Sequence, residues 1–429
     1  MLLTVPVWKK KKGTGTEPAV SSAGLASSVA GSQSPFSTPG SESYYNIDMN
    51  IPRIPLILLF LCLAVGNSAP ALEHVTLHRD GEQFRASGRL LVEAKDGGLL
   101  LEARDGVLWG VQPKELIKRT SDDVLFEPLS REELAERLLG ELPKGFAVLN
   151  TAHYTIFYDT SPTYARWCGS LFERLYRAFN NYWTGKGFKL SDPEFPLVAI
   201  IFADKNTYTR FARSELGDAA GSVFGYYSLR TNRMTMYDLT GIESFKRYTG
   251  SRKTSKGITR ILAQPAAQRT VATIVHEATH QIAHSCGLHQ RYSDCPVWFS
   301  EGIAVYFETP DLNSSKGWRG IGTVNRPRLV EFNRSLKGRP PNSLETLLRD
   351  DKRFRNTNHS LEAYAEAWAL TYFLIHQYPK EYVAYLKTLS RKKPLVYDNK
   401  QQRLDEFERA FGDLELLDME FLRYMKRVR

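Results

Sequence analysis

Val275-His276-Glu277-Ala278-Thr279-His280 is the segment from which the fold of this 429-residue chain can be inferred. It is an H-E-x-x-H pattern, and the surrounding sequence predicts a helix from about Thr270 to His284. Residues four apart lie on one helix face about 6 Å apart along the axis, so two imidazoles can bind one ion. Glu277 then stands beside a water molecule whose pKa a zinc ion lowers towards about 7. The pattern therefore predicts metal-assisted hydrolysis, with Glu277 as the general base.

A site with two imidazoles needs a third ligand from farther along the chain. His284 continues the spacing, but it lies about 12 Å of helix beyond His276, too far for both side chains to reach one ion. A metzincin would need glycine and histidine soon after His280, and this chain has neither at the required positions. Glu301 is the remaining candidate, in a second helix-compatible run from Pro296 to Glu308. The alternative is that His276 and His280 only belong to a core helix.

The spacing between His280 and Glu301 and the W-F-S-E-G-I-A segment around Glu301 resemble the gluzincin arrangement of thermolysin-like and aminopeptidase-like zinc peptidases. This resemblance implies one Zn²⁺ per chain, bound by His276, His280 and Glu301. It also implies a peptide or protein substrate that pairs with an edge strand, for which residues 233–238 are the candidate. A hydroxyl that stabilises the oxyanion is assigned to Tyr364 from chain order alone. An internal strand and a core tyrosine are the respective alternatives.

Four stretches also resemble an uncharacterised family of exported bacterial proteins, a domain of unknown function grouped with gluzincin-like peptidases. They read GYYSLRTNRMTMYD, HEATHQIAHSCGLHQR, PVWFSEGIAVYFE and EAYAEAWALTYFL. The resemblance covers roughly residues 146–429 and implies a zinc peptidase-like domain. The chain departs from thermolysin at Val305, where thermolysin-like enzymes place an aspartate that orients a ligand histidine. The motif therefore leaves open which group supports the ligand histidines.

The N-terminal sequence indicates export. Residues 1–48 form a low-complexity extension that we expect to be disordered, and Met49 is the candidate true initiator, which would make this extension a gene-model artefact. Residues 49–71 have a short basic start, an apolar run and an A-x-A site, which together predict a secretory signal peptide. The protein is then periplasmic or extracellular and touches the membrane only transiently through this segment. An uncleaved membrane anchor is the alternative.

Export to an oxidising compartment makes a disulfide between Cys286 and Cys295 an expectation, with two free thiols as the alternative. These cysteines flank the predicted turn between the two metal-binding helices, so a short loop would be closed. Cys168 is expected to pack as a small hydrophobic residue.

The fold class predicted from these patterns is α+β. Residues 72–127 form a small antiparallel β-rich module, and residues 128–145 a helical linker. Residues 146–429 form a zincin-like catalytic domain, with a small mixed sheet that includes an edge strand, the metal helix and a helical C-terminal part.

The composition is mildly basic, with a net charge of +10, and no nucleic-acid-binding motif accompanies it. We therefore expect no nucleic-acid partner. The sequence predicts an exported zinc metallopeptidase. Two alternatives stay open: a zinc hydrolase acting on a non-peptide amide or cell-wall material, and a non-catalytic scaffold with a vestigial zinc site. Patterning does not indicate the natural substrate or the oligomeric state.

Overall fold

The computed structural model describes residues 71–241, 254–309, 312, 320–356 and 360–429. The N-terminal extension and all but the last residue of the expected signal peptide lie outside this part of the chain. Within the described residues, no helix combines the length and the apolar character needed to cross a membrane. The described chain divides into two compact units: residues 71–101 with 110–126, and residues 102–109 with 127–429.

The smaller unit is built on a five-stranded sheet with the order β4-β3-β2-β1-β5. Its strands are β1 (Ala71–Arg79), β2 (Glu82–Glu93), β3 (Leu99–Ala103), β4 (Leu108–Val111) and β5 (Leu116–Leu125). β1 pairs antiparallel with β2 and with β5, so the expectation of an antiparallel β module is confirmed. The sequence did not predict β5, because both faces of this edge strand are largely exposed and it lacks a regular apolar alternation.

The larger unit contains a mixed five-stranded sheet with the order β6-β7-β8-β10-β9. Its strands are β6 (Ala147–Asn150), β7 (Tyr154–Tyr158), β8 (Leu197–Phe202), β9 (Gly225–Ser228) and β10 (Arg233–Tyr237). The expectation that residues 233–238 form the edge strand is wrong. β10 pairs with β8 on one side and with β9 on the other, so β9 is the edge strand at this end of the sheet and β10 is internal. Every residue of both strands is buried, so their burial pattern does not reveal which lies outermost.

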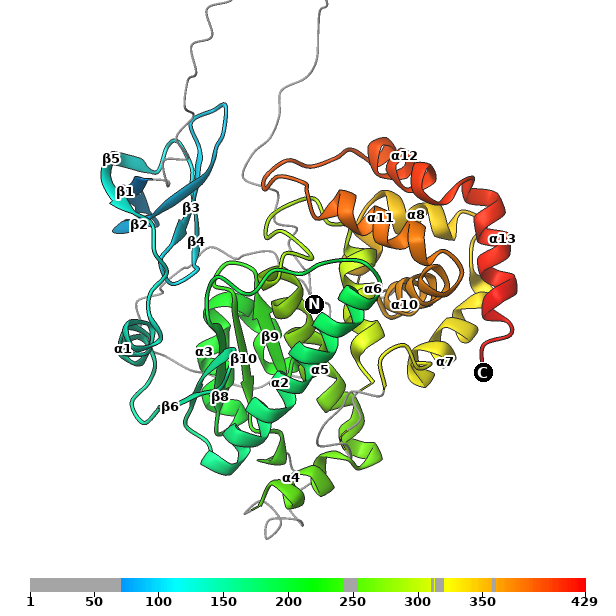
Figure 1. The fold of residues 1–429 in the computed structure, drawn as a ribbon, viewed down its shortest axis with the longest axis horizontal. Coiled ribbons are helices and arrows are strands. Elements are labelled where there is room, and N and C mark those ends of the chain that lie inside the picture. The colour runs from blue at the N-terminus through cyan, green and yellow to red at the C-terminus, as the bar shows by residue number, and fades with distance from the viewer. Residues whose placement is uncertain (1–70, 242–253, 310–311, 313–319, 357–359) are drawn as a thin grey trace, which may run out of the picture. The chain divides into compact units, whose positions relative to one another are not determined.

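Helices supply the rest of the larger unit and make its C-terminal part helical, as expected (Figure 1). They are α1 (Arg131–Glu141), α2 (Pro162–Gly185), α3 (Lys205–Leu216), α4 (Ser255–Leu262), α5 (Pro265–Ser285), α6 (Val297–Phe307), α7 (Arg326–Ser335), α8 (Ser343–Arg349), α9 (Lys352–Arg355), α10 (Ser360–Gln377), α11 (Pro379–Leu389), α12 (Lys400–Phe411) and α13 (Leu414–Met425). Short 3-10 turns span Gly217–Ser222, Leu239–Gly241 and Leu336–Gly338.

The metal helix predicted by the H-E-x-x-H pattern is α5, which begins earlier than expected, at Pro265. Proline suits a first helical turn, because that turn has no use for its missing N–H group. The helix ends in a Schellman motif, in which the Leu288 N–H donates to the Ala283 carbonyl oxygen at 2.9 Å. Gly287 lies between them with a φ of +77°, a conformation that glycine adopts without strain.

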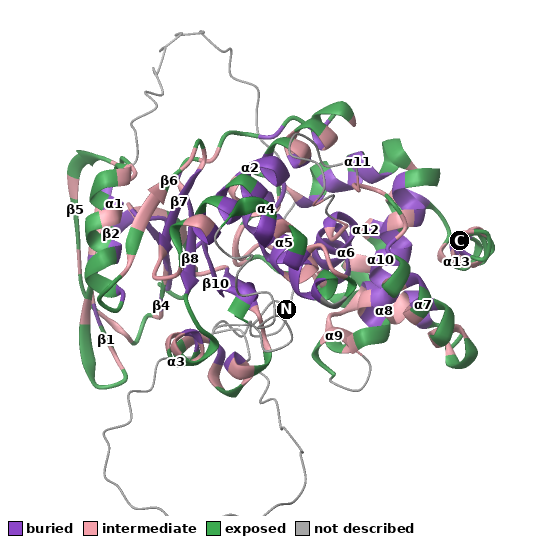
Figure 2. Cartoon of the chain, turned by 90° about the horizontal axis from the view of Figure 1, so that it is seen from below, coloured by how far each residue is buried: buried purple, intermediate pink, exposed green. Residues whose placement is uncertain are grey.

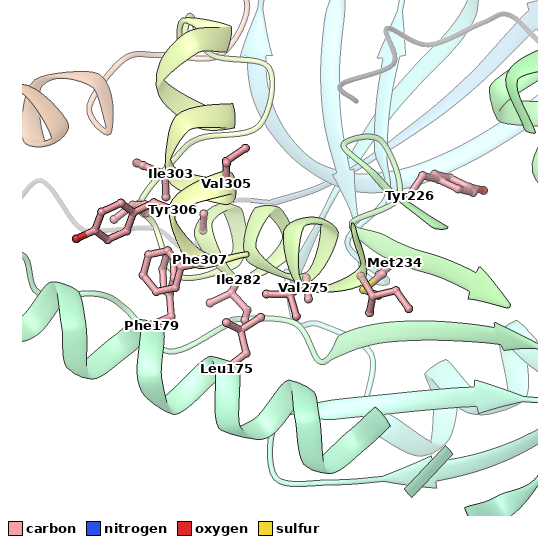
Figure 3. Close-up of a cluster of buried hydrophobic side chains, with 14 of the residues drawn as sticks. Leu175, Phe179, Tyr226, Met234, Val275, Ile282, Ile303, Val305, Tyr306 and Phe307 are labelled. Atoms are coloured by element: carbon pink, nitrogen blue, oxygen red, sulfur yellow. The ribbon is translucent and has the colours of Figure 1, made fainter. Parts of the chain in front are cut away.

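α5 is enclosed by neighbouring elements, and each of its faces has a separate task. Val275 and Ile282 face α2, where Leu175 lies beneath Ile282 and Phe179 packs against Phe307 of α6 (Figure 3). Gln281 faces the sheet, and its Nε2 atom donates to the carbonyl oxygens of Val198 and Asn232, both at 2.9 Å. The remaining face carries the two histidines towards α6. The helix is thus fixed in rotation by apolar and polar contacts together.

α6 lies against α10, and both helices are buried along most of their length (Figures 1 and 2). Gly302 makes this close approach feasible. A Cβ atom at Gly302 would overlap the Thr371 hydroxyl group and would lie 2.9 Å from the Ala367 carbonyl oxygen. The glycine that follows Glu301 in the W-F-S-E-G-I-A segment therefore serves helix packing.

We predict that Gly302→Ala lowers the free energy of unfolding by about 1–3 kcal/mol, because the added methyl group overpacks the contact between α6 and α10. Gly140→Ala in the exposed part of α1, where a Cβ atom meets nothing within 4 Å, is the matched control. This control should leave stability unchanged or raise it by about 0.5–1 kcal/mol. Urea unfolding of both variants measures the difference, and equal stability of the two would contradict the packing account.

Ion pairs from α12 hold the start of α6. The Arg403 guanidinium donates to both Asp294 carboxylate oxygens and, at 2.9 Å, to Asp351 Oδ1. The Asp351 carboxylate also accepts the Val297 N–H at 3.1 Å, the first N–H of α6. The Asp294 side chain is 1% exposed and that of Arg403 10%. The loop before α6 is therefore tied to a helix about one hundred residues later in the chain.

Arg403→Met should cost about 3–5 kcal/mol of stability, because it leaves the buried Asp294 carboxylate without its principal partner. Lys400→Met on the same helix removes an exposed pair with Asp350 and should cost no more than about 1 kcal/mol. Thermal unfolding of the two variants at low and high salt is the measurement. A similar small loss for both would show that Arg403 acts only as a surface charge.

Candidate metal centre

Three ligand-type side chains converge between α5 and α6. His276 and His280 are one turn apart on α5, and their Nε2 atoms lie 3.1 Å from each other. Glu301, in the second turn of α6, places Oε2 2.9 Å from His276 Nε2 and Oε1 3.6 Å from His280 Nε2. One ligand atom from each residue lies within 4.8 Å of the other two, the only such group of three among the described residues.

This donor set fits a divalent cation. A tetrahedral zinc site with bonds of about 2.1 Å has ligand atoms about 3.4 Å apart, close to the separations between His276, His280 and Glu301. All three residues are buried, and Glu301 is 0% exposed. A buried carboxylate is costly unless it faces a positive charge or strong hydrogen-bond donors. Two imidazoles and one carboxylate can therefore hold one ion and leave a fourth position for a water molecule.

Glu277 lies on α5 beside this group and turns towards the edge of the sheet. Its Oε2 atom accepts the backbone N–H of Tyr227 on β9 at 2.9 Å. The Tyr227 hydroxyl donates to Asn232 Oδ1 at 2.8 Å, and the Asn232 side-chain amide donates to Ser285 on α5 at 3.2 Å. The edge strand is therefore linked to the metal helix, and it orients the carboxylate predicted to be the base.

Glu308, at the C-cap of α6, is the feature of this site that the sequence analysis did not assign. Its Oε1 atom lies 2.8 Å from His276 Nδ1. An ionised carboxylate can only accept a hydrogen bond, so Nδ1 of His276 carries the proton. Nε2, which faces His280 and Glu301, is then the nitrogen that could bind a metal ion. Glu308 follows Glu301 by seven residues, two helical turns, which is the signal that would have placed both carboxylates on one face.

The electrostatics of His276 favour a positive charge. Burial alone lowers the pKa of its imidazole, but the carboxylates of Glu301 and Glu308 on either side outweigh burial and raise the pKa to about 9. Burial would also raise the pKa of Glu308, yet the His276 hydrogen bond and the Arg328 charge hold it below its usual range. A metal ion supplies positive charge at the same point, and its binding releases the proton on Nε2.

Tyr364 of α10 lies close enough to the site for the carboxylates of Glu301 and Glu277 to act on its phenol. Burial first, and then the carboxylates of Glu301 and Glu277, raise the pKa of its phenol well above the ordinary value. Its ring centroid is 5.3 Å from that of Phe354 and 5.7 Å from the Arg328 guanidinium carbon. The structure thus brings Tyr364 to the neighbourhood of the metal ligands, and its role as an oxyanion donor stays a prediction.

The expected pairing of Cys286 with Cys295 is corrected, because the three cysteines that the structure describes are free. Cys286, at the C-cap of α5, is directed into the core, where Tyr176 influences its thiol. Cys295 instead lies with its sulfur 3.6 Å from His289 Nδ1. The Gly287 turn sends the chain away from the end of α5, so closeness in sequence does not bring the two sulfur atoms together.

Residues 270–396 match the profile of a family described as "Protein of unknown function (DUF1570)". No curated protein matches the chain. The DUF1570 segment contains the three ligand-type residues, Glu277, Glu308 and Tyr364, whereas Tyr227 and Arg403, which help to position the site, lie outside it. The matched segment thus contains all the ligand-type residues of the centre, and the family description names no activity for them.

Elemental mass spectrometry of the full-length protein should find about one zinc ion per chain, because three converging ligands satisfy a zinc site with one open position. Glu301→Ala should lose this zinc. His284→Ala is the control, since His284 is one turn beyond His280 and outside the ligand group. Zinc retained in Glu301→Ala, or lost in His284→Ala, would contradict the assigned ligands.

Proposed function

We propose that this chain is a zinc-dependent metallopeptidase that hydrolyses peptide bonds in a peptide or protein substrate. The observation that carries the proposal is the convergence of His276, His280 and Glu301 on one point, with a separate carboxylate, Glu277, beside them. A structural metal cluster needs no additional carboxylate next to its ligands, whereas hydrolysis needs a base. The gluzincin-like assignment is part of this proposal.

Each protein group has a defined task in the proposed reaction. When bound, zinc supplies Lewis-acid activation of the attacking water and of the scissile carbonyl. Glu277 takes a proton from that water as the water oxygen bonds to the carbonyl carbon. It then gives this proton to the amide nitrogen as the C–N bond breaks and the amine leaves. The Tyr227 N–H donates to Oε2 of Glu277 at 2.9 Å and so orients the carboxylate that is proposed to transfer this proton.

Tyr364 is proposed to donate a hydrogen bond to the oxyanion. A donor must be protonated. A tyrosine phenol is protonated at neutral pH, and the raised pKa of Tyr364 extends this range to higher pH. The charges of Glu301 and Glu277 influence this phenol, which supports its place beside the reacting bond.

The substrate is proposed to bind as an extended strand beside β9. This strand pairs with β10 on one side, and the Tyr227 N–H points away from that partner to Glu277. A peptide added at this edge therefore runs past the proposed base. β9 thus replaces residues 233–238 as the candidate platform. Export is also part of the proposal, and its support is the sequence of residues 49–71 alone.

Glu277→Gln should keep zinc and lower kcat/KM for peptide cleavage by about 10²–10⁴-fold, since an amide cannot take the proton from water. A library of internally quenched fluorescent peptides is the substrate, and zinc content is measured on the same preparations. Glu136→Gln, on the exposed face of α1, is the matched control and should behave as the wild type.

Full cleavage by Glu277→Gln would remove Glu277 from the role of base. Zinc-loaded wild type that cleaves no peptide in the library, but hydrolyses an amide of a cell-wall fragment, would move the proposal from a peptidase to an amide hydrolase.

A further inference from the structure

The carboxylate of Glu308 has three polar partners, His276, Arg328 and Asn325. Oε1 is shared between His276 Nδ1 at 2.8 Å and an Arg328 guanidinium nitrogen at 3.6 Å. Oε2 accepts the side-chain amide of Asn325 at 3.3 Å. The Glu308 side chain is 9% exposed, so water has little access to these contacts. Glu308 therefore has one geometry, and that geometry places an acceptor against the outer nitrogen of a metal-ligand histidine.

Two of these three contacts come from Asn325 and Arg328, at the start of α7. Asn325 also caps the N-terminus of that helix. Asn325 is the N-cap of α7, and its Oδ1 atom accepts the Arg328 N–H at 3.3 Å. The other end of the same amide group holds Glu308. Arg328, in the first turn of α7, also lies 3.5 Å from Glu331 Oε2. Asn325, the N-cap of α7, thus links this helix to Glu308, the C-cap of α6.

We propose that Glu308, fixed by Asn325 and Arg328 of α7, is the positioning residue that orients His276 for metal binding and sets the affinity of the site for zinc. The inference rests on the proposed function, because it assigns an outer partner to that same zinc centre. Val305, one turn earlier on α6, has no polar group for this task. The carboxylate comes instead from the end of the helix.

Physical chemistry gives the size of the expected effect. A carboxylate that accepts the Nδ1 proton prevents the imidazole from turning and from moving its proton to Nε2, the nitrogen that binds metal. Loss of such an outer partner typically weakens metal binding by about 10–100-fold. A glutamine at this position keeps an acceptor oxygen but loses the charge, so its effect should be smaller.

The test is a zinc titration of metal-stripped full-length protein in competition with a chromophoric chelator. Glu308→Ala should bind zinc about 10–100-fold more weakly than the wild type, and Glu308→Gln should fall between them. Glu331→Gln is the matched control, because it also removes a carboxylate bound by Arg328 yet makes no contact with His276. It should bind zinc as the wild type does.

A second readout separates positioning from general destabilisation. In the cobalt(II)-substituted protein, Glu308→Ala should shift the visible absorption bands, which report ligand geometry, while Glu331→Gln leaves them in place. Unfolding of the zinc-free variants then shows how much stability each carboxylate contributes. A merely structural Glu308 would alter unfolding and leave both the cobalt spectrum and the zinc affinity unchanged.

The outcomes distinguish this inference from the proposed function. If Glu308→Ala binds zinc as tightly as the wild type does, the role of Glu308 is overturned and the proposed peptidase is left intact. An equal loss in Glu308→Ala and Glu331→Gln would also overturn it, because α7 packing would then explain the change. A wild type that binds no zinc would overturn the proposed function, and this inference with it.

Discussion

The buried carboxylate of Glu301 is the constraint on which the rest of the larger unit depends. A carboxylate that is 0% exposed costs several kcal/mol unless positive charge or strong donors face it. His276 and His280 face it from α5, and the pKa of His276 is raised to about 9 by the surrounding carboxylates. The two helices must therefore meet at a fixed distance and rotation.

Three sets of contacts fix the two helices. Gln281 binds α5 to carbonyl oxygens of the sheet, and Gly302 lets α6 approach α10. Arg403, on α12, binds Asp294 and so holds the loop between the two helices. Only the last of these involves charges, and it is almost completely buried. The geometry of the centre is thus a property of the whole unit, although the ligand residues come from a short segment.

The sequence predicted the centre better than its surroundings, for physical reasons. His276, His280 and Glu301 follow from helical spacing and from one aromatic-rich segment, both of which are local. The inner position of β10 and the separation of Cys286 from Cys295 depend on tertiary neighbours that no local pattern encodes. The position of Glu308, two turns beyond Glu301, was a local signal, but its partner His276 lies on another helix, α5. Strands β9 and β10 look alike because every residue of both is buried.

The ion pair between Arg403 and Asp294 has a consequence for how related sequences should vary. The DUF1570 match ends at residue 396, so the cation and its buried anion lie on opposite sides of that boundary. A relative that replaces Arg403 alone leaves the buried Asp294 carboxylate with only the more distant Lys392, whose Nζ atom lies 3.6 Å away. Substitutions at positions 294 and 403 should therefore be correlated across relatives. That covariation would mark α12 as part of the same evolutionary unit as the segment that carries His276, His280 and Glu301.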